Sequence, residues 1–192
     1  MPEQWYEVVA PTEGLLQGDI ILRCPILDWK QAPLQIQGQG ELEQLKLSYD
    51  ILEVDVVVMT QACDLEQKNV KDVVVCPLYS LTDVKSTWTA KQQAAGQNSG
   101  AKPWKGLCDD IKKGFVWNMA MLNHGEVDGQ KIDHRIVDFH DIYTIPLPFL
   151  QSIASNRGPR FRLRPPYREH LSQAFARYFM RVGLPSNVET AW

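Results

Sequence analysis

The sequence lacks several features that would assign a chain to a class at once. Its 192 residues contain no apolar run long enough to cross a bilayer, and its N-terminus shows no basic segment followed by an apolar run. It has only four cysteines and no C-x-x-C pair. We therefore expect a cytoplasmic protein with free thiols, no membrane partner and no cofactor.

The common catalytic motifs are missing as well. The chain has no Walker loop, dinucleotide-binding fingerprint, serine nucleophile elbow or H-E-x-x-H pair, which argues against the enzyme classes built on them. Structural zinc sites usually have closely spaced, paired ligands, so we expect no metal site. A zinc site formed by separated cysteines with His124 or His134 stays open as an alternative.

What is present is typical of a globular protein. Hydrophobic residues make up 44% of the chain and charged residues 22%, and the length predicts a single domain over residues 1–192. Gly18–Leu22 reads as a turn feeding a strand that Pro25 limits. The alternating runs Leu34–Gln37 and Leu45–Ile51, separated by Gly38 and Gly40, predict a hairpin.

Two apolar, β-branched runs, Val54–Met59 and Val73–Leu78, predict strands that are buried on both faces. Between them, Asp64 with Gln67 three residues later predicts a capped helical turn. Further strands are expected at 113–121 and 132–145, joined by turn residues at 125–129.

Residues 86–102 are rich in Gln, Ala, Ser, Lys and Gly, and we interpret them as an exposed loop with a helical turn at 90–95. At the C-terminal end, apolar residues recur at helical spacing from Tyr167 to Val182, which predicts an amphipathic helix over 166–182. The predicted class is α+β, mainly β: a small antiparallel barrel or coiled sheet over about 15–164, with this helix packed on it.

Residues 18–79 resemble the MazF/PemK family of toxin ribonucleases. Members of that family begin a small barrel with Gly-Asp-Ile, matched by Gly18-Asp19-Ile20. A Val-rich strand ending in Ser or Thr follows, matched by Val56–Thr60, and then a strand ending in Pro, similar to Val73–Leu78. The resemblance implies a barrel, an RNA partner and a setting in toxin–antitoxin systems or phage defence.

The chain departs from that family at its catalytic arginine. The family places Arg-Pro before the buried strand, and Glu53-Val54-Asp55 stands there instead. Thr60 matches the family's Ser/Thr but lacks this arginine as a partner. The segments Thr60–Leu65 and Pro166–Pro185 also resemble uncharacterised bacterial proteins, which imply no function.

Positive charge is concentrated in one segment. The whole chain has 20 Lys and Arg against 23 Asp and Glu, a net charge of −3, but residues 157–181 hold seven arginines and one acid, Glu169. That segment is therefore +6 and the remainder −9. The arginines are Arg157, Arg160, Arg162, Arg164, Arg168, Arg177 and Arg181.

Three explanations of the arginines stay open. They pair with acids inside the fold or remain solvated, they bind the phosphates of RNA, single-stranded DNA or a nucleotide, or they dock an acidic protein. As a strand, residues 160–164 would place three guanidinium groups on one face, with Phe161 and Leu163 on the other.

Candidates for catalysis are Thr60, Cys63, Asp138 and His140. A strand over 135–143 would put Asp138 and His140 on one face, and a carboxylate beside an imidazole suits general acid–base work. The alternative is an ordinary polar strand face. Cys63 follows a buried strand and as a nucleophile would need His134 or His140 as its base; otherwise it only neighbours a helix cap.

Three functions follow from these observations. The first is a nucleic-acid-associated barrel similar to the MazF/PemK toxins but without their catalytic arginine. The second is a non-enzymatic module that docks an acidic partner or a second copy through the arginine-rich segment. The third is a hydrolase of the ribonuclease kind that uses Asp138, His140 or Cys63.

Overall fold

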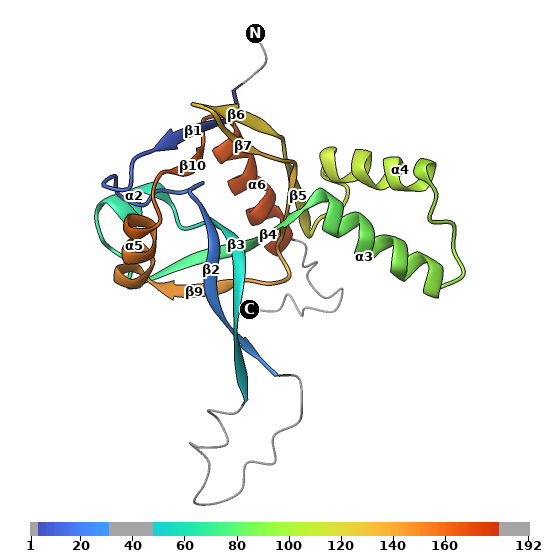
Figure 1. Ribbon diagram of the computed structural model, residues 1–192, viewed down its shortest axis with the longest axis horizontal. Helices are drawn as coiled ribbons and strands as arrows, with labels where there is room; N and C mark the ends of the chain where they lie inside the picture. The colour runs from blue at the N-terminus through green and yellow to red at the C-terminus, as the bar shows by residue number, and fades with distance from the viewer. Residues whose placement is uncertain (1–3, 31–47, 181–192) are drawn as a thin grey trace, which may run out of the picture. The chain divides into compact units, whose positions relative to one another are not determined.

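The computed structural model describes residues 4–30 and 48–180 (Figure 1). Contacts divide the chain into two compact units. We call Tyr6–Leu78 with Asp141–Leu163 the sheet unit, and Met1–Trp5 with Tyr79–His140 and Arg164–Trp192 the arm unit. The predicted hairpin strand Leu34–Gln37, its glycines and residues 45–47 lie outside the described residues.

The sheet unit is built from antiparallel strands. Its strands are β1 (Tyr6–Val9), β2 (Ile20–Trp29), β3 (Tyr49–Val58), β4 (Asp72–Ser80, whose last two residues belong to the arm unit), β9 (Tyr143–Pro146) and β10 (Arg160–Leu163). Its helices are α2 (Ala62–Glu66) and α5 (Leu147–Asn156). β3 pairs with β2 and β4, β9 pairs with β4, and β1 pairs with β10.

The two valine-rich strands form the core of this unit, as predicted. Val56 and Val58 on β3 and Val73 and Val75 on β4 are fully buried. Leu150 of α5 joins the same apolar cluster. Because these residues are β-branched and covered on both faces, the strands need no alternation of apolar and polar residues.

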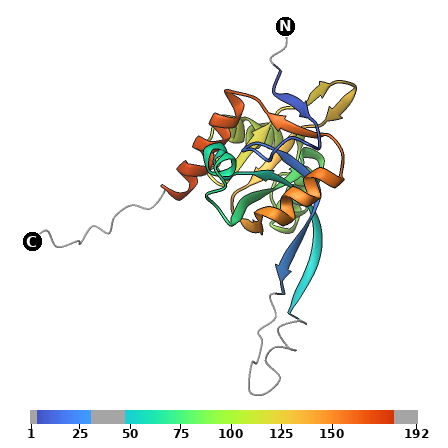
Figure 2. The same cartoon turned by 90° about the vertical axis from the view of Figure 1, so that its left-hand side faces the viewer.

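Pro25 does not end its strand, contrary to our expectation. β2 continues to Trp29, opposite Tyr49, and passes a bulge between Ile21 and Cys24. In the described residues β2 pairs only with β3, and the two strands run together as a long ribbon (Figure 2). An edge strand tolerates proline because the missing N–H is not needed by a second neighbour.

The arm unit contains two helices in place of the predicted loop over 86–102. α3 (Leu81–Ala94) and α4 (Ala101–Lys112) are connected through Gly96 and Gly100 (Figure 1). The loop prediction was wrong because it took the scarcity of large apolar residues in 86–102 as a sign of a loop. Ala, Gln and Lys favour helix by themselves, and α3 buries none of its residues. Ser80 caps α3 by accepting a hydrogen bond from the Asp83 amide at 3.0 Å.

The other arm-unit strands are shorter than expected. β5 (Met119–Leu122) pairs with β8 (Arg135–Asp138), and β6 (Gly125–Val127) forms a hairpin with β7 (Gln130–Ile132). The predicted strand 113–121 begins only at Met119, and 132–145 is divided among β7, β8 and β9. Asp128 and Gly129 have positive φ, which a tight hairpin turn requires.

The C-terminal helix is confirmed as α6 (Tyr167–Phe179). Leu171 is buried, Phe175 packs edge-on against Phe139 at 5.5 Å, and the ring of Tyr167 stacks on Trp5 at 4.0 Å. The α+β class with antiparallel strands is therefore confirmed, but in the described ranges the sheets do not close into a barrel.

A buried ion cluster ties the start of β2 to β10. Asp19 is fully buried and accepts hydrogen bonds from Arg160 Nε at 2.8 Å and from Arg162 Nε and Nη2. Both guanidinium groups also donate to the Gly14 carbonyl at 2.7 Å. Burial acts to lower the pKa of Arg162, but the hydrogen bonds and charge of Asp19 outweigh burial and raise it.

Replacing Asp19 tests this cluster. Asp19→Asn removes the buried anion and leaves Arg160 without its carboxylate partner and Arg162 with only the more exposed Glu13, 3.7 Å away. We therefore expect the free energy of unfolding to fall by about 3–5 kcal/mol. Urea unfolding followed by circular dichroism measures the change. The control is Glu53→Gln, which breaks the exposed pair between Arg23 and Glu53 and should cost less than about 1 kcal/mol. Equal losses in both variants would contradict the role of Asp19.

Candidate functional site

The arginines on β10 pair inside the fold. Arg160 and Arg162 are 6% and 5% exposed and surround Asp19, so the first of the three explanations holds for both. Arg160 and Arg162 share one side of β10, as predicted, but both faces of the strand are buried and Arg164 follows its end. Arg157 donates to the carbonyl groups of Leu22 and Arg23. The sheet unit thus uses its arginines as structural cations.

The remaining arginines belong to the arm unit. Arg164 donates to Gln4 Oε1 at 2.9 Å, and Arg168 pairs with its neighbour Glu169 at 2.7 Å. Arg177 is exposed and lies over the ring of Trp117, 4.9 Å from its centroid. Arg181 lies outside the described residues. Among the described residues of this group, Arg164 and Arg177 have no carboxylate partner.

Thr60 and Cys63 belong to the sheet unit. Thr60 Oγ1 accepts a hydrogen bond from the Val74 amide at 2.7 Å, which is a structural contact between successive segments. Cys63 is exposed in α2, with its thiol 3.7 Å from Gln61 Oε1. Asp64 does not cap α2, because Gln61 occupies the cap position and Asp64 lies in the first turn. Neither Thr60 nor Cys63 has an imidazole partner within its unit, because all four histidines belong to the arm unit.

Asp138 and His140 do lie together, as predicted, although β8 ends at Asp138. Asp138 Oδ1 accepts the backbone N–H of His140 at 2.9 Å and lies 3.3 Å from His140 Nδ1. Asn118 Nδ2 lies 3.1 Å from the same ring nitrogen. These contacts orient the imidazole of His140, whose side chain is 59% exposed.

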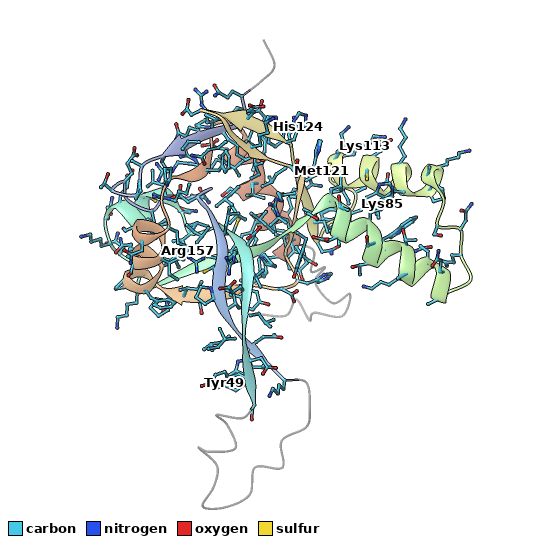
Figure 3. The ribbon with its side chains drawn as sticks, viewed as in Figure 1. Tyr49, Lys85, Lys113, Met121, His124 and Arg157 are labelled. Atoms are coloured by element: carbon cyan, nitrogen blue, oxygen red, sulfur yellow. The ribbon has the colours of Figure 1, made fainter. Side chains whose placement is uncertain are left out.

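A basic groove was missed by the sequence analysis. It has a volume of about 320 Å³ and lies between the end of α4, β5 and α6. Its cationic and titratable lining comes from Lys112, Lys113, His170 and Arg177, and within residues 4–30 and 48–180 no aspartate or glutamate lines it. Figure 3 labels Lys113 after α4 and Met121 on β5, two of the lining residues.

The end of α4 shapes this groove. Gly114 has a φ of +72°, a conformation that side chains rarely adopt, and its amide donates to the Ile111 carbonyl at 3.0 Å. A Cβ placed there would lie 3.3 Å from Arg177 Nη1. A glycine therefore lets the guanidinium of α6 approach the two lysines that end α4.

Aromatic rings border the same groove. Trp5 and Tyr167 line it as a stacked pair, with an interplanar angle of 11°. The cations of the basic groove suit the phosphates of a single-stranded nucleic acid, and the flat aromatic rings suit its bases.

The charge of the chain is divided between the units. The described arm unit has eleven Lys and Arg against eight Asp and Glu, a net charge of +3. The described sheet unit has seven against eleven, a net charge of −4. Residues 81–113 alone hold six lysines against three aspartates. That lysine excess was the signal in the sequence that could have found the groove.

A second concavity lies in the arm unit, which we call the α3–α4 cavity. Its volume is about 440 Å³, within the range of small-ligand pockets. Trp88, Met119 and Ile136 are among its apolar walls, and Asp138 is one of its polar residues.

His124 and His134 form a further pair, with ring centroids 4.8 Å apart. The described residues contain no group of three His, Cys, Asp or Glu side chains that would hold a metal ion. Cys24 and Cys76 are buried, and burial raises the pKa of Cys24 to about 11. No helix in the described ranges is long and apolar enough to cross a membrane.

The pair of His124 and His134 predicts how the free energy of unfolding depends on pH. Burial, and then repulsion from His124 and Lys112, lowers the pKa of His134, and Asp133 only partly opposes the shift. As the pH falls, His134 therefore binds a proton more readily in the unfolded chain than in the folded chain. The free energy of unfolding has its full value at neutral pH and decreases below about pH 6.5. We expect His134→Gln to reduce the loss of unfolding free energy between about pH 7.5 and about 5.5. Denaturant titrations at both pH values measure it, and an unchanged pH dependence would contradict the assignment.

Comparison of the chain with protein-family models, curated proteins and solved structures finds no match.

Proposed function

We propose that this chain binds single-stranded RNA through the basic groove of the arm unit. The observation that carries the proposal is the groove's lining: Lys112, Lys113 and Arg177 converge there with His170, and no carboxylate of the described residues lines the same surface. Cations that share one concave surface repel each other, and a phosphate chain relieves that repulsion.

The stacked rings support a single strand over a duplex. Trp5 and Tyr167 stack on each other beside the cations, and an unstacked base of any sequence can extend such a stack. The resemblance of residues 18–79 to the MazF/PemK toxins agrees with an RNA partner. Because the family's arginine is replaced by Glu53-Val54-Asp55, the proposal is limited to binding.

The proposal changes which residues are expected to bind RNA. Arg160 and Arg162 are committed to Asp19, and Arg157 to backbone carbonyl groups. Among the described residues, Arg177 is the predicted arginine that lines the groove. Lys112 and Lys113 replace the others. Lys112 has one distant acidic neighbour, Asp109 at 4.0 Å, and both partners of that pair are solvent-exposed.

Salt dependence of binding tests the proposal. Three permanent cations on a single strand predict a slope of about −2 in a plot of log K against log salt, so affinity should fall about 15- to 20-fold between 50 mM and 200 mM. Fluorescence anisotropy of a labelled oligouridylate measures it. Lys112→Gln with Lys113→Gln should weaken binding and bring the slope to between −1 and about −0.5.

A matched control lies on the same helix. Lys102→Gln with Lys105→Gln removes the same charge from exposed positions of α4 that do not line the groove. This variant should retain the slope of the unchanged protein. Binding that is absent, insensitive to salt or equally weakened by both pairs of substitutions would overturn the proposal.

A further inference from the structure

The α3–α4 cavity adjoins the basic groove. Met119 lines both, and a small recess lined by Gly114, Val116, Trp117, Met119, Ala174 and Arg177 shares residues with each. A strand whose phosphates lie along the groove would therefore have a cavity beside its path. At about 440 Å³ the cavity has room for a nucleobase.

The walls of the cavity suit a flat, mostly apolar ring. Trp88 comes from α3, Leu107 from α4 and Ile136 from β8. The ring of Trp88 is half-buried and packs at an angle on Trp104, with centroids 5.4 Å apart. A base extruded from a single strand is read in such pockets by stacking and by hydrogen bonds to its edge.

Asp138 supplies a hydrogen-bond acceptor in this cavity. Its Oδ1 is held by the backbone N–H of His140 at 2.9 Å, whereas its Oδ2 has no partner among the described residues. An ionised carboxylate only accepts hydrogen bonds, so it selects a ligand edge that carries N–H donors.

The other polar residues of the lining narrow the choice. Asp83 is engaged with Ser80 Oγ at 2.6 Å, where it supports the cap of α3. Lys91 adds a donor on the same lining, and Thr87 and Tyr79 add hydroxyl groups. The required ligand edge therefore has adjacent N–H donors for the carboxylate and an acceptor for an ammonium group.

We propose that the α3–α4 cavity binds guanine. Guanine presents N1–H and N2–H side by side for Asp138, with O6 next to them for Lys91. Uracil places carbonyl oxygens on both sides of its single N–H, and adenine has a ring acceptor beside its amino group. The inference rests on the proposed RNA binding for the source of the base, but a free guanine nucleotide carries the same chemistry.

Short oligonucleotides test this inference. The pentamer UUGUU should bind about tenfold more tightly than UUUUU, UUAUU or UUCUU, and replacing the guanine by hypoxanthine, which lacks the N2 amino group, should lose most of that gain. Asp138→Asn should abolish the preference, so that UUGUU binds no more tightly than UUUUU. Asp128→Asn, the same charge change in the β6–β7 turn, should keep the preference.

The outcomes separate the two proposals. Equal, salt-sensitive binding of all four pentamers would overturn the guanine site and leave RNA binding standing. Quenching of tryptophan fluorescence by guanosine monophosphate, lost in Asp138→Asn, without any pentamer binding would support the guanine site for a free nucleotide and overturn RNA binding. No response to pentamers or nucleotide would overturn both.

Discussion

The sheet unit depends on one buried anion. Asp19 is the buried carboxylate that binds both guanidinium groups of β10, and the more exposed Glu13, 3.7 Å from Arg162, adds a second negative charge. The same guanidinium groups bind the carbonyl of Gly14, so the turn before β2 and the strand β10 are held by one network. A segment whose composition suggests a polyanion-binding surface is thereby committed to holding the fold together.

That commitment changes where function is to be sought. With the arginines of β10 paired inside the fold, the described sheet unit has a net negative charge and the described arm unit a net positive charge. All four histidines belong to the arm unit too, as do the groove, the cavity and the organised Asp138 carboxylate. Net charge over the whole chain hides this division, because the two units largely cancel.

Local patterns predicted elements well where burial and periodicity agree. The predictions of β3 and β4 from their valine runs and of α6 from its helical spacing are confirmed. In each segment the local pattern of apolar residues is also what the fold buries. The loop prediction over 86–102 was wrong because a solvent-exposed helix, stabilised by propensity, capping and a Trp88–Trp104 contact, lacks an apolar stripe. The helix α5 was not predicted at all.

The sequence by itself determined the α+β class, the two core strands, the C-terminal helix and the concentration of arginine, since these follow from local composition and spacing. Only the tertiary structure decided which arginines pair with Asp19, which lies 141 positions away in the chain from Arg160. It also decided that Lys112 and Lys113 share a groove with Arg177. Ion pairs and grooves join residues distant in sequence, and no local pattern records their partners.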